Sequence, residues 1–428
     1  FFVFSHTKTI MFCGRRSKKR QLAGTNGVMF SGGGEPALAR ILGYSTSELP
    51  TKVGAKDWGI FYVADNYDIR ARTGEPTVGY GVEYLQPSKL WNNPKLFSQG
   101  TLEDTPGHFS DINQGTLGNC WLMAAMSAVA RYGVSTQLFC SPLQASEPRS
   151  TVCVKLYKQD GENGGFKSSF QQTVSTTIPC KNGRPTYCRS DDAGEYWPCV
   201  VEKAVASAFS SGGYPALEGG MTVVGMGMLV GGDSYWIQTK ADLTGHELYD
   251  IWHRLMSKGI TICCGWKEVA GGVEGRNGEP SARDGLVSGH AYTCFGLVNV
   301  DGHRLAQFRN PWGVGVRGCE TGAGGGEWTG TWSDCDQSTW DKYPAVKAAC
   351  QWNGKAADGM FWMSLHDVAV NLSRGYQVFI PHDEAMRGVD LTGRSGGSGG
   401  SGSGDSGGSG SGDSGGSGSG DSGGSGSG

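Results

Sequence analysis

The sequence predicts an α+β fold, in which a mostly helical half is followed by a mostly antiparallel β half and then by a flexible tail. Apolar runs of good helix formers lie between residues 120 and 209, and short β-like runs lie between residues 260 and 309. From residue 395 onward the chain contains only Gly, Ser and Asp. Such a composition cannot offset the entropy lost on ordering, so the tail is expected to be a disordered coil.

Three segments predict helices. The first, residues 120–132, is apolar and Ala-rich, and Asn119 is a suitable N-cap for it. The second covers residues 195–209. The third, residues 243–258, is amphipathic and is stopped by Gly259.

Three later runs predict strands, at residues 260–266, 291–300 and 303–309. The stretch between the first two, residues 271–284, is rich in glycine and charge. It predicts a mobile loop, which ends just before His290 and is therefore placed to gate a site.

Glycine pairs predict the division of the chain into parts. We expect Gly212-Gly213 and Gly219-Gly220 to lie in loops and Gly231-Gly232 to mark the boundary between two lobes. The predicted parts are a first lobe at 85–230, a second lobe at 231–385 and a disordered tail at 386–428. Residues 1–84 are Gly-rich and weakly patterned, and the sequence assigns them no fold.

The charge balance limits the partners. A net charge of −3 argues against nucleic acid or an anionic membrane as the main partner. The basic run at residues 15–20 is interpreted as a solvated arm, and the apolar stretch at 1–12 is too short to span a bilayer. The chain begins Phe-Phe and stops inside a repeat, so it is interpreted as a fragment. Membrane association is not evident in it, although the parent protein could be attached to a membrane.

The cysteines predict a reducing, cytoplasmic environment. There are 13 of them, an odd number, without any CxxC pair, and most lie in apolar surroundings. We interpret them as reduced thiols and expect no zinc site. His246-Glu247 begins like a zinc-protease motif, but the next histidine is His253, so that class is excluded.

Cys120 is the predicted nucleophile. A cysteine in the first turn of a helix lies near amide donors and the positive end of the helix dipole, and both favour the thiolate. Gln114 lies six residues upstream, across two glycines that let the loop fold back. Its side-chain NH2 is expected to form an oxyanion hole with the backbone N–H of Cys120.

His290 and Asn310 are the predicted base and orienting residue. His290 lies at the mouth of a predicted strand, and Asn310 follows the next strand. The asparagine can accept a hydrogen bond from one imidazole nitrogen and leave the other facing the sulfur, with Trp312 shielding that bond. Each residue alone has an ordinary structural interpretation, as core, loop or turn. Their occurrence together, in the order Cys, His, Asn, predicts a cysteine peptidase.

Three sequence blocks resemble the active-site blocks of the calpain family of cysteine peptidases: residues 115–121 (GTLGNCW), 285–292 (GLVSGHAY) and 309–313 (RNPWG). Other similar blocks are residues 195–204, 214–220, 326–334 and 359–364. The resemblance covers roughly residues 85–385. It implies a papain-like core with two lobes, with Gln114, Cys120, His290 and Asn310 in the oxyanion, nucleophile, base and orienting positions.

The resemblance also implies a function. Members of the family cleave proteins inside cells in a limited way, and calcium brings their two lobes together. We therefore expect protein substrates with extended or disordered segments. The family binds one calcium per lobe, and the matching acids are Asp111 and Glu195 in the first lobe and Glu327, Asp334 and Asp358 in the second.

Three departures from animal members change the expectation. Asn119 replaces an acid just before the nucleophile, and its role as N-cap is expected to survive. Phe109 and Met360 replace an arginine and an acid that pair across the lobes, and Met360 also removes one calcium ligand. Weaker calcium binding and an apolar contact between Phe109 and Met360 are therefore expected.

Two other functions remain open. One is a catalytically silent calpain-like interaction module, although no catalytic position is replaced. The other is a papain-like acyltransferase such as a transglutaminase, which would want an aspartate in place of Asn310.

Overall fold

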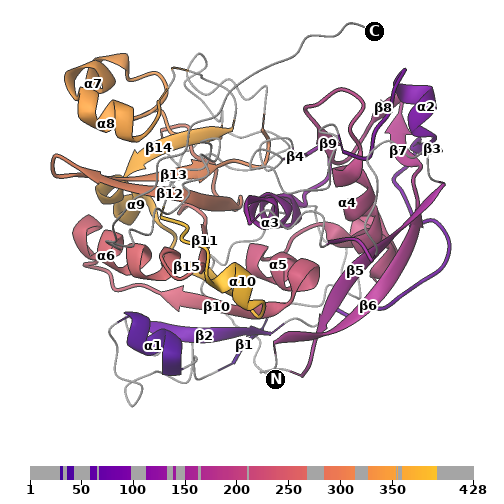
Figure 1. Ribbon diagram of the computed structural model, residues 1–428, viewed down its shortest axis with the longest axis horizontal. Helices are drawn as coiled ribbons and strands as arrows, with labels where there is room; N and C mark the ends of the chain where they lie inside the picture. The colour runs from indigo at the N-terminus through magenta and orange to yellow at the C-terminus, as the bar shows by residue number, and fades with distance from the viewer. Residues whose placement is uncertain are drawn as a thin grey trace, which may run out of the picture. The chain divides into compact units, whose positions relative to one another are not determined.

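A computed structural model describes most of the chain between residues 29 and 392 (Figure 1). The described residues are 29–31, 36–42, 58–64, 67–97, 112–132, 138–140, 150–161, 165–209, 212–267, 284–313, 326–352, 354 and 359–392. All of them belong to one compact unit, Phe1–Gly396. The disordered tail predicted at 386–428 begins too early, because residues 386–392 are described and both Met386 and Leu391 are buried. Residues 393–428 and nearly all of the predicted loop at 271–284 lie outside the described residues.

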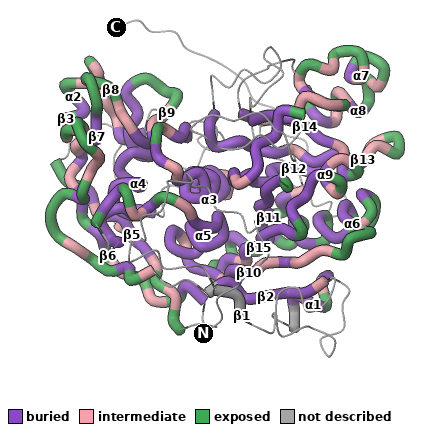
Figure 2. The backbone as a smooth tube through the Cα atoms, turned by 180° about the vertical axis from the view of Figure 1, so that it is seen from behind, coloured by how far each residue is buried: buried purple, intermediate pink, exposed green. Residues whose placement is uncertain are grey.

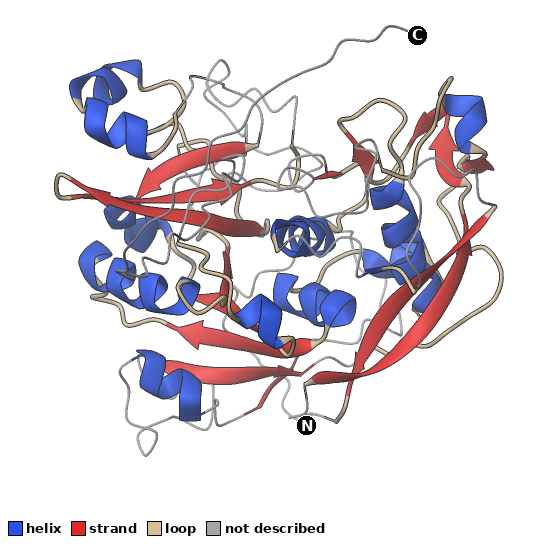
Figure 3. Cartoon of the chain, in the orientation of Figure 1, coloured by secondary structure: helices blue, strands red, loops and turns tan. Residues whose placement is uncertain are grey.

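A ten-stranded antiparallel sheet forms the largest element (Figure 3). Eight strands follow one another across it: β1 (Met29–Ser31), β2 (Gly59–Ala64), β10 (Gly232–Gln238), β15 (Gly375–Pro381), β11 (Thr261–Cys264), β12 (Tyr292–Val300), β13 (His303–Arg309) and β14 (Met360–Ser364). The long hairpin of β5 (Thr151–Gln159) and β6 (Phe166–Ser175) joins through the pairing of β6 with β10.

Two small antiparallel sheets lie in the first part of the chain. One contains β3 (Glu83–Leu85), β7 (Ile178–Lys181) and β8 (Arg184–Pro185), and the other pairs β4 (Ile112–Asn113) with β9 (Arg189–Ser190). The second sheet fixes the segment just before Gln114, since Asn113 lies opposite Arg189.

The described helices are mostly short. They are α1 (Pro36–Leu42), α2 (Pro87–Leu90), α3 (Cys120–Arg131), α4 (Trp197–Ala208), the 3₁₀ helix η3 (Tyr214–Leu217), α5 (Thr222–Val230), α6 (Gly245–Met256), α7 (Gln337–Lys342), α8 (Pro344–Ala349), α9 (Leu365–Asn371) and α10 (Glu384–Arg387). The three predicted helices and three predicted strands are thereby confirmed, with ends that differ by a few residues. The mixed, antiparallel fold class is confirmed as well.

Helix α3 is the central buried helix. Every residue from Cys120 to Ala130 is buried, as the purple tube in Figure 2 shows. It contacts α5, β12 and β4, so it touches elements from both halves of the chain. Helix α6 is different, because it is amphipathic and begins with a capping box between Thr244 and Glu247.

The apolar interior is divided between two main clusters. One contains α3, α4 and α5, and the other contains α6 and most of the strands from β10 onward. The chain passes from the first to the second between Leu229 and Tyr235, which includes the predicted boundary at Gly231-Gly232. The large sheet continues across this division, because Gly232 pairs with Phe166.

Many of the described elements were not predicted, among them two groups that belong to the large sheet. The hairpin of β5 and β6 shows the alternating burial of a sheet with one covered face, a pattern that the sequence also carries. The second is the N-terminal group of β1, α1 and β2. Strand β2 pairs with β10, and α1 packs against α6, so this segment extends the sheet of the second half.

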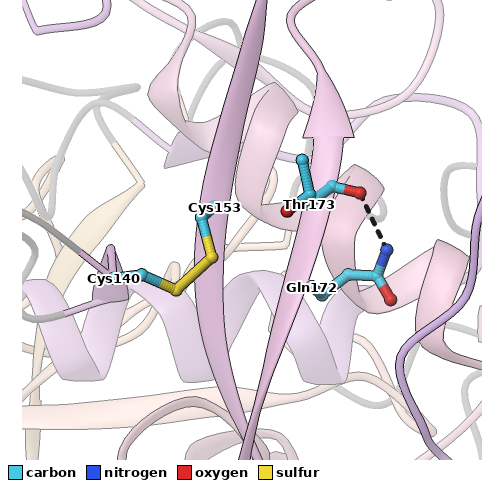
Figure 4. Close-up of a disulfide and its surroundings, with 4 residues drawn as sticks. All are labelled: Cys140, Cys153, Gln172 and Thr173. Carbon is cyan, nitrogen blue, oxygen red and sulfur yellow. Dashed lines mark hydrogen bonds between the residues drawn. A yellow bond between two sulfur atoms is a disulfide. The ribbon is translucent and has the colours of Figure 1, made fainter.

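The prediction that all thiols are reduced is wrong for Cys140, Cys153 and Cys335. Cys140 and Cys153 form a disulfide, with Cα atoms 5.4 Å apart (Figure 4). Cys153 lies in β5 opposite Thr173 of β6, and its carbonyl accepts a hydrogen bond from the amide of Cys140 at 2.9 Å. The spacing of the cysteines along the sequence could not show that Cys140 and Cys153 lie next to each other. Cys335 is disulfide-bonded too. The cysteines therefore no longer support a reducing compartment.

Within the described residues, no helix is both long enough and apolar enough to cross a membrane.

Candidate active site

Cys120 is the first residue of α3, as predicted, and is 1% exposed. It forms a small apolar cluster with Ala124 of the same helix and with Ala291. Ala291 directly follows His290 in the segment that leads into β12. The helix start and the histidine segment are therefore packed against each other.

The loop before Cys120 is held by backbone contacts on both sides. The amide of Gln114 donates to the carbonyl of Pro311 at 2.9 Å, and the amide of Thr116 donates to the carbonyl of Thr186 at 3.1 Å. Gly115 lies so close to the carbonyl of Tyr187 that a Cβ atom would overlap it. A glycine is therefore required at position 115.

The Gln114 side chain is buried and donates through Nε2 to the carbonyl of Leu117 at 2.7 Å. One of its two amide hydrogens therefore supports its own loop. The other remains for the predicted oxyanion role, since a primary amide carries two donors.

The expected capping role of the Asn119 side chain is wrong. Asn119 occupies the N-cap position of α3, and its carbonyl accepts from the amides of Leu122 and Met123. Its side chain makes no capping bond and instead donates to Oε1 of Glu202 at 2.7 Å. Glu202 lies in α4 and was not singled out from the sequence. The only hint was an acid within an apolar helical run.

Trp121 anchors the start of α3 to the end of η3. Its indole N–H donates to the carbonyl of Leu217 at 2.8 Å, and the ring of Tyr67 stacks on it at 6.3 Å. The Tyr67 hydroxyl donates to the carbonyl of Gly219 at 3.2 Å, and the amide of Gly219 donates to the carbonyl of Gly118 at 3.0 Å. The glycine-rich turn at 219–220 is thereby fixed beside the cysteine loop.

His290 and Asn310 form the predicted pair. Nε2 of His290 lies 2.7 Å from Oδ1 of Asn310, and both residues are at most 1% exposed. An amide oxygen can only accept, so Nε2 carries the hydrogen and Nδ1 is the basic nitrogen of the neutral ring. The amide of Asn310 donates to the carbonyl of Gly359 at 2.8 Å, which fixes the asparagine backbone at the end of β13.

Trp312 covers this pair. Its ring centre lies 4.7 Å from that of His290, and its backbone amide donates to Oδ1 of Asn310 at 3.1 Å. Gly326 has no room for a side chain, because a Cβ would overlap the side-chain NH2 of Asn310 and the ring of Trp312. The hydrogen bond between His290 and Asn310 is therefore enclosed by protein.

Tyr292 was not predicted, yet it helps to hold this enclosure. Its hydroxyl accepts from the amide of Val287 at 3.2 Å and donates to the carbonyl of Gly326 at 2.8 Å. Its ring meets that of His290 edge to face at 5.2 Å. The residue lies in the block at 285–292, two positions after the histidine.

Arg309 connects the two halves beside the site. It is 1% exposed and precedes Asn310 directly at the end of β13. Its guanidinium donates to Oγ of Ser127 in α3 at 2.8 Å and to the carbonyl of Ile112 at 2.7 Å. The helix of the nucleophile, the segment before Gln114 and the strand of Asn310 thus meet at one side chain.

Three of the five predicted calcium ligands lie within the described residues. Glu195 and Glu327 are both 1% exposed, and Asp334 follows in the loop after Glu327. Glu195 accepts from the hydroxyl of Ser190 at 2.6 Å, and Glu327 accepts from the amide of Gly359 at 3.0 Å. Asp111 and Asp358 lie outside the described residues.

The described part of the chain contains no group of three or more His, Cys, Asp or Glu side chains arranged to hold a metal. The donor set nevertheless fits calcium in kind, because the described candidates are carboxylates, which are hard oxygen ligands, and Glu195 and Glu327 are buried. Met360, which stands in place of an acid, is half-buried and packs against the first apolar cluster. Phe109, its expected partner, lies outside the described residues.

Comparisons with known proteins agree with this geometry. The family model described as "Calpain family cysteine protease" matches residues 61–374. The chain belongs to the calpain family. The match includes Cys120, His290 and Asn310 and begins within β2.

Relatives in the family come from animals and plants. Calpain-8 of Rattus norvegicus is 30% identical over 336 residues, which are 76% of this chain and 40% of the relative. The calpain-1 catalytic subunit of Bos taurus is 29% identical over 306 residues, or 69% of this chain and 37% of the relative. The calpain-type cysteine protease DEK1 of Arabidopsis thaliana is 28% identical over 326 residues, which are 74% of this chain and 14% of the relative. The chain thus spans less than half the length of these calpain relatives.

Proposed function

We propose that this chain is the catalytic core of a cysteine endopeptidase, with Cys120 as nucleophile, His290 as base and Asn310 as the residue that orients it. A first lobe at 85–230 would carry the nucleophile, and a second lobe at 231–385 would carry the other two. The observation that carries the proposal is the enclosed hydrogen bond between His290 and Asn310, at 2.7 Å, beside the start of α3.

The geometry supports the following chemistry. Nδ1 of His290 takes the thiol proton, and the sulfur attacks the substrate carbonyl to form a thioester while the protonated imidazole gives its proton to the departing amine. Water, deprotonated by the same nitrogen, then hydrolyses the thioester and returns the thiol. The amide of Cys120 and the remaining N–H of Gln114 stabilise the oxyanion in both steps.

We include calcium regulation in the proposal. Asp111 and Glu195 would hold one ion, and Glu327, Asp334 and Asp358 would hold a second. Each ion would supply fixed positive charge that orders the loops around it. Glu327 supports this role, since its carboxylate accepts a hydrogen bond from the amide of Gly359. The carbonyl of Gly359 in turn accepts one from the backbone amide of Asn310. Ordering of that loop would therefore act directly on the orienting residue.

The proposed substrates are proteins inside the cell, cleaved within extended or disordered segments. The proposed compartment is the cytoplasm, and no nucleic acid is proposed as a partner.

The test compares three proteins with a fluorogenic casein substrate in calcium: the unaltered chain, Cys120→Ala and Cys180→Ala. Cys180 is also a buried free thiol and serves as the matched control. We expect the unaltered chain and Cys180→Ala to release peptides, and we expect Cys120→Ala to lose activity by several orders of magnitude while remaining folded.

Labelling separates the alternatives. An irreversible thiol-directed peptidase inhibitor should modify Cys120 in the active protein. Modification of another cysteine, with Cys120 intact in an active sample, would overturn the assignment. Absence of any turnover would favour the silent interaction module, and incorporation of a labelled amine into a glutamine peptide would favour an acyltransferase.

A further inference from the structure

Glu202 is an acid in the interior of the first apolar cluster. It is 1% exposed and lies in the middle of α4. Its Oε1 accepts from the side-chain amide of Asn119 at 2.7 Å, and its Oε2 accepts from the backbone amide of Cys188 at 3.0 Å. Both carboxylate oxygens are therefore used by N–H donors.

No basic side chain of the described residues neutralises this carboxylate. Lys203, the next residue, turns away and pairs with Glu75 at 2.5 Å. The titratable groups around Glu202 are thiols and phenols whose pKa values are raised by burial, so they are neutral near pH 7: Cys188, Cys199, Tyr84, Tyr187 and Tyr214. Burial also raises the pKa of Glu202 from its ordinary 4.5 to about 7.

The position of Glu202 ties it to the nucleophile. Its partner Asn119 immediately precedes Cys120 and makes no capping bond to α3. Within the described residues, Oδ1 of Asn119 has no hydrogen-bond partner and is buried. A buried acid costs stability, and such groups are concentrated at functional sites.

The protonation state of Glu202 determines which way the Asn119 amide faces. An ionised carboxylate only accepts, so Nδ2 must point toward it, as in the structure. The Cys188 N–H is fixed in the backbone and keeps one oxygen as its acceptor. When the other oxygen takes up a proton from water, it becomes a donor, and the Asn119 amide must turn over to present Oδ1.

We propose that Glu202 is a positioning residue for the nucleophile and that its charge state, acting through the Asn119 side-chain amide, sets the reactivity of Cys120. Protonation forms the O–H bond of the acid with a proton from water, and it reverses the direction of the Asn119 side-chain amide, directly before Cys120. The inference rests on the proposed role of Cys120 and extends it with a regulatory group that responds to pH near neutrality.

Glu202→Gln provides the sharpest test, because it mimics the protonated acid at every pH. Its amide oxygen can accept from Cys188, and its NH2 can donate to a turned Asn119. In the unaltered protein, we expect the pH profile of Cys120 alkylation by iodoacetamide to contain a transition near pH 7 in addition to the ionisation of the thiol itself. The rate should change roughly tenfold across it, the effect of one charge-assisted hydrogen bond. In Glu202→Gln, the transition near pH 7 should be absent and only the ionisation of the thiol should remain, with a change in kcat and little change in KM.

The matched control is Glu247→Gln. Glu247 is exposed in the capping box of α6, and glutamine preserves such a box. This variant should keep both the transition and the activity of the unaltered protein. Rates would be measured from about pH 5 to about pH 9, a range that includes the ionisation of a base near neutrality.

Asn119→Ala gives an independent test should Glu202→Gln fail to fold. It removes the amide that turns, so the transition in Cys120 alkylation should disappear, and adding Glu202→Gln should have no further effect on that rate. A transition retained in Glu202→Gln or in Asn119→Ala, or its absence from the unaltered protein, would overturn the inference. Alkylation needs no peptide turnover. A transition without peptidase activity would therefore support the inference while the proposed function fails.

Discussion

The guanidinium of Arg309 donates to the hydroxyl of Ser127, 2.8 Å away, so the strand that ends at Asn310 is bonded to the helix that begins at Cys120. A second bond, to the carbonyl of Ile112, holds the segment that leads to Gln114. One buried side chain therefore sets the relative position of the proposed nucleophile, oxyanion donor and orienting residue.

The first prediction concerns this connection. Arg309→Lys should lower the free energy of unfolding by about 1–3 kcal/mol, because an ammonium group cannot reproduce the planar fork that reaches both acceptors. Turnover should fall as well, since Asn310 and Cys120 would no longer be held in their relative positions. Urea denaturation and peptide release would measure both. Arg304→Lys, the same change at a more exposed position on β13, is the control and should have little effect on either.

The second prediction concerns Gln114. Gln114→Ala should reduce kcat roughly 100-fold if the side chain stabilises the oxyanion. Alkylation of Cys120 develops no oxyanion and should continue at its normal rate. Gln171→Ala, at an exposed position on β6, is the control. Equal losses in both assays would mean that the bond from Gln114 to Leu117 merely supports the loop.

The third prediction concerns calcium. Cys120→Ala should bind calcium in a calorimetric titration, and activity should fall in chelator. Met360→Glu should lower the calcium concentration needed for half-maximal activity by roughly tenfold, because it adds a carboxylate ligand. Met360→Gln, similar in size but uncharged, should not. Full activity with calcium removed, or no binding heat at millimolar calcium, would contradict the prediction.

The fourth prediction concerns stability and pH. The folded pKa of Glu202, about 7, lies above its ordinary value of 4.5, so the folded state binds the proton more tightly than the unfolded state. The contribution of Glu202 to stability is therefore present below pH 4.5 and is lost as pH rises through about 7, a change of about 3 kcal/mol. Urea denaturation across this window should show the loss in the unaltered protein. The same loss of stability with rising pH in Glu202→Gln would contradict its assignment to Glu202.

The sequence predicted the local elements of the site well. A cysteine at the start of an apolar helix, a histidine before a strand and an asparagine after the next strand each follow from short patterns. The structure places these elements as expected, and His290 and Asn310 meet. The predicted calcium ligands were named from resemblance, and two of them lie outside the described residues.

The interactions that the sequence did not predict join residues far apart in the chain. Asn119 looked like an N-cap because the preference of asparagine for that position is local, whereas its actual partner Glu202 lies on another helix. The disulfide of Cys140 with Cys153 depends on how the chain after α3 returns along β5. The assignment of β2 to the second half required knowledge of its pairing with β10, which no local pattern in residues 1–84 reveals.

The pairing of β10 has a consequence for how the protein is made. Ile237 lies between Ile60, which is synthesised long before it, and Tyr376, which is synthesised long after it. The centre of the large sheet therefore remains open at one edge until β15 has left the ribosome. Pairings of such long sequence separation form slowly and leave strand edges exposed in the meantime. A nascent chain that stalls before residue 375 should consequently present β10 as an unpaired edge, ready to associate with other chains or to engage a chaperone.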